Sequence, residues 1–355
     1  MGNLSEDIYY NGDAILSRNA TINMVVGMRS VGKTYWFKRF CIRKYIERGD
    51  QWIYLRRHES QIENVRKDNG QTLLADVSKE FPKHEMRIRG FLIQIRPIAD
   101  KDGETNPNKW ETMGYVLSLI GYMNLKGTNY DKVRNILFDE FIREPRNKTV
   151  DRYLNDEVGA FFNFYNTVDR FRDVVRVFML ANAGDLTNPY FLTWKIGKPN
   201  KGFSRYQDNL ICLEYAITPK FKEYASSTKS ARLMRGTDYG AFAIDNEFIN
   251  DSEEFIFDSK PQSAKCYYAI VYSGHDFGIW RDMSSGNFYI TDGAPKTVQR
   301  LAMLRTDMRP NIILIKRNET LLSNVMECYR YGMTLFDKSV TRELFCEVME
   351  MCGIR

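Results

Sequence analysis

The feature that most constrains the fold of this chain is an eight-residue segment between an apolar run and a helical stretch. Residues Gly27–Thr34 match the pattern G-x-x-x-x-G-K-[ST]. The apolar run Ala20–Val26 precedes them, and Thr34–Arg48 follows with apolar residues at helical spacing. The segment therefore predicts a phosphate-binding loop, because glycines let backbone N–H groups and a helix N-terminus face an anion.

The residue types in this loop suit a nucleoside triphosphate with a metal ion. Lys33 is predicted to hold the β- and γ-phosphates and Thr34 to be a ligand of Mg²⁺. The other predicted contacts to the nucleotide are the rest of the loop: Gly27, Met28, Arg29, Ser30, Val31 and Gly32. We expect ATP and Mg²⁺ as ligands. The alternative, a glycine-rich turn that only caps a helix, requires neither the lysine nor the threonine.

Polar residues that end two later apolar runs complete the predicted site. Asp139 and Glu140 follow the run Asn135–Phe138, where Asp139 suits the Mg²⁺ shell and Glu140 suits a base that polarises water. Asn182 follows the run Val174–Leu180, at the position of a polar sensor for the γ-phosphate. Alone, the acidic pair is also compatible with a simple loop entry, and Asn182 with an Asx turn.

Strand-like and helical segments alternate in the first half of the chain, which predicts an α/β domain with a parallel sheet over residues 1–198. A hairpin is expected at Met86–Ile95, around Gly90. The break Pro199–Gly202 opens a predicted linker over 199–240, and a smaller α+β domain is expected over 241–355. Its predicted elements are strands at Ala264–Ser273, Phe277–Arg281, Asn287–Thr291 and Asn311–Ile315, and a helical tail from Lys338.

Composition excludes several other classes of protein. No apolar run is long enough to span a membrane, so no membrane partner is expected. The six cysteines form no Cys-x-x-Cys pair and there are three histidines, which argues against a zinc site and for a reduced, intracellular protein. The net charge of +6 is compatible with a polyanionic partner without proving one.

Basic residues supply candidates for two roles. A guanidinium accelerates phosphoryl transfer, and in ring motors it often comes from a neighbouring subunit. The candidates are Arg143, Arg146, Arg170, Arg172 and Arg176, each of which could also be an ordinary surface arginine. Lys220, Lys222 and Arg232, in the predicted linker, are candidates for contacts to nucleic-acid phosphates, with a solvated linker as the alternative.

Several segments together resemble the DNA-packaging ATPases of the φ29-like phages, relatives of the large terminases. The resemblance covers most of the chain, and its most specific segment is Phe138–Glu144. Arg29 is similar to the arginine of terminase phosphate loops, and Thr167–Arg170 falls where the family has its trans-acting arginine. The other matching segments are Tyr54–Arg57, Glu80–Pro82, Asn182-Ala183, Asn188–Phe191, Gly236–Gly240 and Asp245-Asn246.

The resemblance implies a fold, an activity and partners. The first domain would be an ASCE/RecA-like P-loop NTPase domain, and the C-terminal domain would be RNase H-like. The chain would be an ATP-driven translocase that packages double-stranded viral DNA into a procapsid, with Glu140, Lys33, Arg170 and Arg29 catalytic. It would form a homo-oligomeric ring, a pentamer in this family, on the portal (connector) of the procapsid, with a packaging RNA as a further candidate partner. It would occupy the host cytoplasm and, transiently, the procapsid.

One departure from the large terminases concerns their nuclease. The strand-like run Cys266–Ser273 has no acidic residue where a metal ligand is expected, and Asp276, Asp282 and Asp292 read more simply as turn residues. We therefore expect a vestigial nuclease domain that binds DNA, the portal or a packaging RNA without cutting. Two alternatives stay open: a large terminase with an active nuclease, and a nucleotide-gated adaptor that does not turn ATP over.

Overall fold

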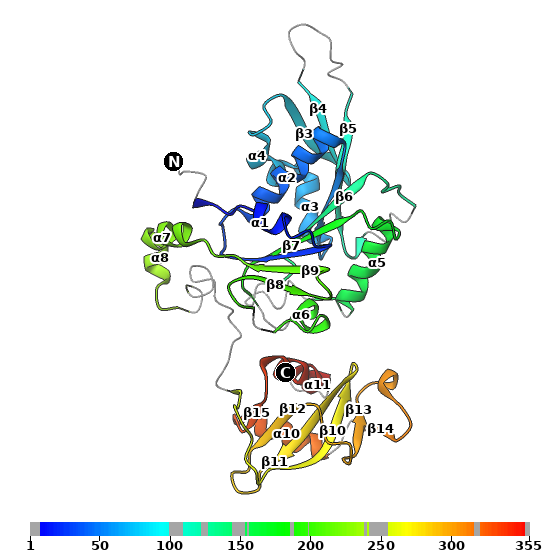
Figure 1. Cartoon of the computed structure of the whole chain (residues 1–355), viewed down its shortest axis with the longest axis vertical. Coiled ribbons are helices and arrows are strands. Elements are labelled where there is room, and N and C mark those ends of the chain that lie inside the picture. The colour runs from blue at the N-terminus through cyan, green and yellow to red at the C-terminus, as the bar shows by residue number, and fades with distance from the viewer. Residues whose placement is uncertain are drawn as a thin grey trace. The chain divides into compact units, whose positions relative to one another are not determined.

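In a computed structural model, the chain divides into two compact units, Met1–Ile249 and Asn250–Arg355 (Figure 1). The structure describes residues 8–98, 109–121, 127–143, 153–154, 156–184, 188–197, 199–237, 240, 255–315 and 320–351. Within these residues, no helix combines the length and apolar character needed to cross a membrane.

The first unit is built on a nine-stranded sheet with the order β3-β4-β5-β2-β6-β7-β1-β9-β8. The six strands from β5 to β9 in this order are parallel, and the pairs at the two edges are antiparallel. The strands are β1 (Ile22–Val26), β2 (Gln51–Arg56), β3 (His84–Arg89), β4 (Leu92–Pro97), β5 (Glu111–Ser118), β6 (Val133–Asp139), β7 (Arg176–Ala181), β8 (Gly202–Tyr206) and β9 (Ile211–Tyr215). This confirms the predicted α/β class and the hairpin around Gly90.

Helices cover both faces of this sheet, which explains why its central strands have apolar side chains on both faces. On β1, Met24 and Val26 pack with the face that holds α5, whereas Val25 packs with the face that holds α2. The helices are α1 (Asp13–Leu16), α2 (Lys33–Arg48), α3 (Ser60–Lys67), α4 (Gln71–Ser78), α5 (Glu157–Asp169), α6 (Pro189–Thr193), α7 (Pro219–Ser227) and α8 (Lys229–Met234).

The predicted domain boundary after residue 198 needs correction. Strands β8 and β9 lie beyond it but belong to the first sheet, where β9 pairs in parallel with β1. Thus the range 199–240 is not one linker: after the two strands it contains the helices α7 and α8. The described chain of the first unit continues to Thr237 and Gly240, and the division at Ile249 lies among residues outside the described ranges.

The second unit contains a six-stranded sheet with the order β14-β13-β10-β11-β12-β15. Strands β10, β11 and β12 form an antiparallel meander, and β13 is parallel to β10. A meander whose first strand pairs in parallel with the fourth agrees with the expected RNase H-like sheet. The elements are β10 (Lys265–Tyr272), β11 (His275–Arg281), β12 (Phe288–Asp292), β13 (Arg300–Ala302), η5 (Arg305–Asp307), β14 (Ile312–Leu314), α10 (Thr320–Arg330), β15 (Thr334–Phe336) and α11 (Ser339–Met351).

The three aspartates singled out in this unit have different surroundings. Asp276 accepts two hydrogen bonds from Arg300, at 3.0 and 2.8 Å. Asp282 organises a turn by accepting from Ser284 and Ser285, and these bonds hold the pKa of its carboxyl well below the ordinary value. Asp292 lies 3.2 Å from the Lys338 ammonium. Only Asp282 is therefore a turn residue of the predicted kind.

Candidate functional site

The phosphate loop leaves β1 at Gly27 and enters α2 at Lys33. Gly32 caps the helix with a φ of 95°, a left-handed conformation that glycine adopts without a steric penalty. A Cβ at Gly27 would lie 3.2 Å from the Ala216 Cβ and 3.3 Å from the Lys33 Cδ, so the backbone is closely surrounded there. Gly32 is therefore favoured by its backbone conformation, whereas a side chain at Gly27 would displace its neighbours slightly.

Lys33 lies folded against the loop that precedes it. Its Nζ donates to the carbonyl oxygens of Gly27 at 2.9 Å and Met28 at 2.7 Å, and to Asn182 Oδ1 at 3.2 Å. Burial lowers the pKa of Lys33 to about 7, against the opposing attraction of Asp139. A phosphate anion beside this ammonium would favour its charged form.

Thr34 and Asp139 come together at the start of α2 and the end of β6. The Thr34 hydroxyl donates to Asp139 Oδ1 at 3.0 Å, and the Tyr54 hydroxyl donates to Asp139 Oδ2 at 3.1 Å. No cluster of three or more His, Cys, Asp or Glu side chains suited to a metal occurs in the described ranges. One hydroxyl and one carboxylate nevertheless fit Mg²⁺, which usually takes one or two protein oxygens and completes its shell with phosphate and water.

Glu140 differs from its neighbour in both backbone and exposure. Its φ is 57°, a left-handed conformation that costs a non-glycine residue energy and is common at functional sites. The Glu140 side chain is 44% exposed, whereas that of Asp139 is 12% exposed. Its carboxylate pairs with the guanidinium of Arg56, at the end of β2. The base candidate is therefore accessible and held by an arginine.

These groups surround one cavity of about 250 Å³. Its lining contains most of the predicted nucleotide contacts, with Tyr35 and Ala181 in addition: Arg29, Ser30, Val31, Gly32, Lys33, Thr34, Asp139, Glu140 and Asn182. The structure thus brings together residues from the loop after β1, the start of α2 and the ends of β6 and β7, as expected for a site at the carboxyl ends of parallel strands.

The arginine candidates lie in different places. Arg170 is the exposed C-cap of α5, and Arg172 is bonded to backbone carbonyls beside it. Arg176 hydrogen-bonds Asn19, and Arg143 lies over the Tyr153 ring. Arg146 is outside the described residues. None of the described ones lines the cavity within its own subunit.

The nucleic-acid candidates are exposed cations on two helices. Lys220 and Lys222 lie on α7, and Arg232 lies on α8. Helix α7 begins close to the phosphate loop, since Thr218 just before it contacts the Met28 sulfur at 3.6 Å. The three candidate cations thus lie on helices of the first unit and not in an unstructured linker.

The structure also contains a buried ion pair, Arg57–Glu157, that no motif or spacing in the sequence predicts. Arg57 Nε donates to Glu157 Oε1 at 2.8 Å, with both side chains 0% exposed. Arg57 also donates to the Phe141 carbonyl at 2.6 Å, and Tyr190 donates its hydroxyl to Glu157 at 3.1 Å. The pair links the end of β2, the residue after Glu140 and the start of α5. The resemblance included Arg56 and Arg57 in a matching segment, but without a role.

A second buried contact supports the phosphate loop from its other side. The Tyr10 backbone N–H donates to the Val31 carbonyl at 2.9 Å, and its hydroxyl donates to Glu214 Oε2 on β9 at 2.6 Å. Burial raises the pKa of the Glu214 carboxyl, against the hydrogen bond from Tyr10 and the attraction of Arg18. The folded state therefore binds a proton here more readily than the unfolded chain does.

The raised pKa of Glu214 gives a pH-dependent prediction for Glu214→Gln. Because the pKa of Glu214 is raised on folding, its charge penalises the folded state above that pKa, and the penalty disappears as the pH falls below the unfolded value. Glutamine can still accept the Tyr10 hydrogen bond. We expect the difference in Tm, variant minus wild type, to be more positive at pH 8 than at pH 4, by differential scanning calorimetry. A difference independent of pH would contradict this.

Comparisons with known proteins show the family of this chain. A family model described as Podovirus DNA encapsidation protein (Gp16) matches residues 4–352. The chain is 33% identical to a DNA packaging protein of Bacillus phage phi29 over 99% of this chain and 100% of that protein. It is 31% identical to a DNA packaging protein of Bacillus phage B103 over 96% of this chain and 100% of that one.

Solved structures show the same likeness. The chain is similar to one in the bacteriophage Phi-29 viral genome packaging motor assembly, with a TM-score of 0.75 and 31% identity over 97% of this chain and 99% of that one. It is also similar to the N-terminal domain of the DNA packaging ATPase from bacteriophage phi29, with a TM-score of 0.50 and 33% identity over 60% of this chain and 99% of that one. The chain belongs to the Podovirus DNA encapsidation protein (Gp16) family.

Proposed function

We propose that this protein is an ATP-driven translocase that packages double-stranded viral DNA into a procapsid as a homo-oligomeric ring. The observation that carries the proposal is the convergence of Lys33, Thr34, Asp139 and Glu140 on one cavity. A lysine for phosphates, two metal-ligating oxygens and a carboxylate base are what ATP hydrolysis requires. Family membership and the likeness to packaging ATPases add the DNA-packaging role.

Each residue has a stated task in the proposed hydrolysis. Thr34 and Asp139 would hold Mg²⁺, which neutralises charge on the phosphates. Lys33 would turn from its loop carbonyls toward the β- and γ-phosphates, and Arg29 and Asn182, which line the same cavity, would contact the γ-phosphate. Glu140 would accept the proton of the attacking water, which requires that its carboxylate first leave Arg56.

The topology supports an action of Arg170 in trans. Helix α5 connects β6 to β7, and its last turn lies near the start of β6, because Arg172 bonds the carbonyls of Tyr130 and Asp131. The seven residues of β6 separate that end from Asp139 by roughly 20 Å. This exceeds the length of an arginine side chain, so Arg170 would serve the site of a neighbouring subunit.

The remaining partners follow from the same proposal. The ring would be a pentamer on the portal of the procapsid, in the host cytoplasm, with a packaging RNA as a further partner. Lys220, Lys222 and Arg232 would contact DNA phosphates without reading sequence. The second unit would bind DNA, the portal or the packaging RNA without cutting DNA. Nicking of supercoiled plasmid in Mn²⁺ by the purified protein would instead favour an active terminase.

Steady-state ATPase measurements test the proposal directly. We expect turnover that DNA stimulates, and a loss of about 10³-fold or more in Arg170→Ala. Mixing Arg170→Ala subunits with Glu140→Gln subunits should restore activity, since some interfaces then combine an intact base with an intact arginine. No turnover in the wild type, with or without DNA, would favour a nucleotide-gated adaptor. Absence of restoration at every ratio would contradict the action in trans.

A further inference from the structure

The turn that follows α5 has an unusual backbone for its residue types. Arg170, Phe171 and Asp173 have φ values of 52°, 58° and 54°, although none of them is glycine. Left-handed conformations are disfavoured for residues with a Cβ, and they persist only where surrounding contacts enforce them. Something in the structure must therefore hold this turn.

The side chains of the turn do not hold it by packing. Phe171 is 84% exposed, and Arg170 and Asp173 are exposed as well. Within the described ranges, Arg170 makes no side-chain hydrogen bond or ion pair. The conformation is consequently imposed by the residues on either side of Arg170 and Phe171.

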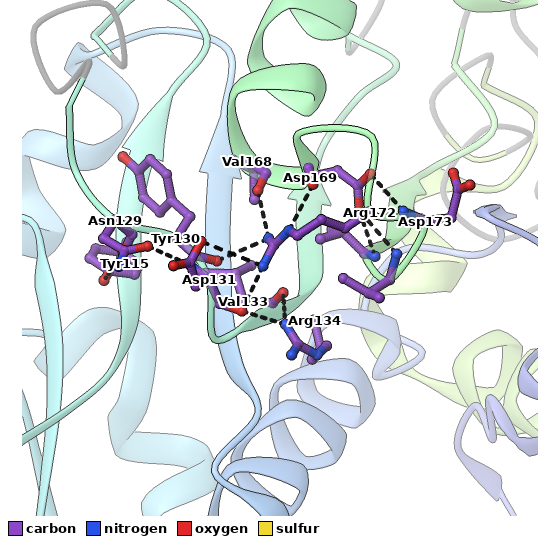
Figure 2. A network of polar contacts seen from close by, with 12 residues as sticks. Tyr115, Asn129, Tyr130, Asp131, Val133, Arg134, Val168, Asp169, Arg172 and Asp173 are labelled. Carbon is purple, nitrogen blue, oxygen red and sulfur yellow. Dashed lines mark hydrogen bonds and ion pairs between the residues drawn. The ribbon is translucent and has the colours of Figure 1, made fainter.

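Asp169 is the first of these residues. Its side chain is buried at the end of α5, and its carboxylate accepts from the backbone N–H groups of the last turn residue and of the two residues that follow it. Oδ2 accepts from Asp173 at 3.0 Å, while Oδ1 accepts from Val174 at 3.1 Å and Val175 at 3.0 Å. The carboxylate thus ties the chain after the turn back to the residue before it, as Figure 2 shows.

Arg172 is the second residue that holds the turn. Its Nε donates to the Asp169 carbonyl at 2.8 Å and its Nη2 to the Val168 carbonyl at 2.9 Å, at the C-terminal end of α5. The same guanidinium donates to the carbonyls of Asp131 at 2.7 Å and Tyr130 at 3.3 Å (Figure 2). It therefore fixes the turn both to its own helix and to the loop before β6.

We infer that Asp169 and Arg172 are positioning residues that hold Arg170 ready for the phosphate site of a second copy of this chain. The inference rests on the proposed action of Arg170 in trans. A guanidinium on a mobile turn would have to be ordered at each hydrolysis event, whereas one on a fixed turn is already placed. The pinned carboxylate and the four carbonyl bonds of Arg172 supply that placement.

Kinetics of single and double variants test the inference. Asp169→Ala and Arg172→Ala should lower kcat roughly 10- to 100-fold with KM for ATP unchanged, because each subunit keeps its own nucleotide contacts. Arg172→Lys should also lose activity, since an ammonium cannot donate in the planar fork that reaches these carbonyls. The matched control is Arg134→Ala: Arg134 also bonds the Asp131 carbonyl, at 2.6 Å, but does not touch the turn.

A double-variant comparison separates positioning from general damage. Asp169→Ala combined with Arg170→Ala should have the kcat of Arg170→Ala alone, because Asp169 acts on hydrolysis only through Arg170. Arg172→Lys should bind a fluorescent ATP analogue with an affinity near that of the wild type, and its Tm should also stay near the wild-type value. Mixing Asp169→Ala subunits with Glu140→Gln subunits should restore activity, as for Arg170→Ala.

Opposite results overturn the inference. If Arg170→Ala loses activity while the variants of Asp169 and Arg172 keep it, Asp169 and Arg172 have no positioning role and the proposed function stands. The positioning role is likewise excluded if the losses of Asp169→Ala and Arg170→Ala multiply in the double variant. If Arg170→Ala itself keeps the wild-type kcat, the action of Arg170 in trans fails, and the positioning role fails with it.

Discussion

Replacing Glu140 with glutamine is expected to lower kcat for ATP hydrolysis by about 10²- to 10⁴-fold, the usual contribution of a general base. Glutamine has almost the same shape but cannot accept a proton from water at neutral pH. The bonds that hold Lys33 and join Thr34 to Asp139 do not involve Glu140. Nucleotide affinity should therefore change little, by titration with a fluorescent ATP analogue.

Two further variants sharpen this prediction. Glu140→Asp keeps the charge but withdraws the carboxylate by one methylene, so we expect activity between those of wild type and Glu140→Gln. Glu47→Gln makes the same chemical change on α2, outside the cavity, and should leave kcat unaltered. Wild-type turnover in Glu140→Gln would show that another group activates the water.

Truncating either partner of the buried pair Arg57–Glu157 should have the largest effect on stability. Arg57→Ala or Glu157→Ala leaves an uncompensated charge in a site with 0% exposure, which costs about 3–5 kcal/mol. In a domain of this size the loss corresponds to a fall in Tm of roughly 6–20 °C. Thermal or urea unfolding of the variants measures it.

The control for this prediction is an exposed pair. Glu63 and Lys67 lie 3.2 Å apart with side chains 53% and 72% exposed, so Lys67→Ala should cost at most about 1 kcal/mol. Replacing Arg57 and Glu157 together with Met and Leu should recover part of the loss, because no unpaired charge then remains. An Arg57→Ala protein as stable as Lys67→Ala would contradict the prediction.

The cavity proposed to bind the nucleotide could be predicted from the sequence because its parts are local. Gly32, Lys33 and Thr34 lie in one strand-loop-helix unit, and Asp139 and Glu140 lie at the end of a single strand. Parallel strands bring their carboxyl ends to the same edge of a sheet, so the two segments had to meet there.

The parts that escaped prediction depend on contacts between distant segments. Glu157 follows Arg57 by 100 positions, and no spacing rule pairs residues so far apart. Strands β8 and β9 come directly after a segment with Gly197, Lys198, Pro199, Asn200 and Lys201, a composition typical of a linker. The place of β9 beside β1 is set by burial of its Ile211 and Leu213 against the core, and β8 then pairs with β9, which only the folded sheet reveals.

The position of β9 has a practical consequence for preparing the ATPase unit alone. A truncated chain ending at residue 198 would strip β1 of one neighbour and expose its row of backbone N–H and C=O groups. An unprotected strand edge of this kind pairs readily with other chains and promotes aggregation. An expression fragment should therefore extend at least through Tyr215, and through α8 if the exposed cations are to be retained.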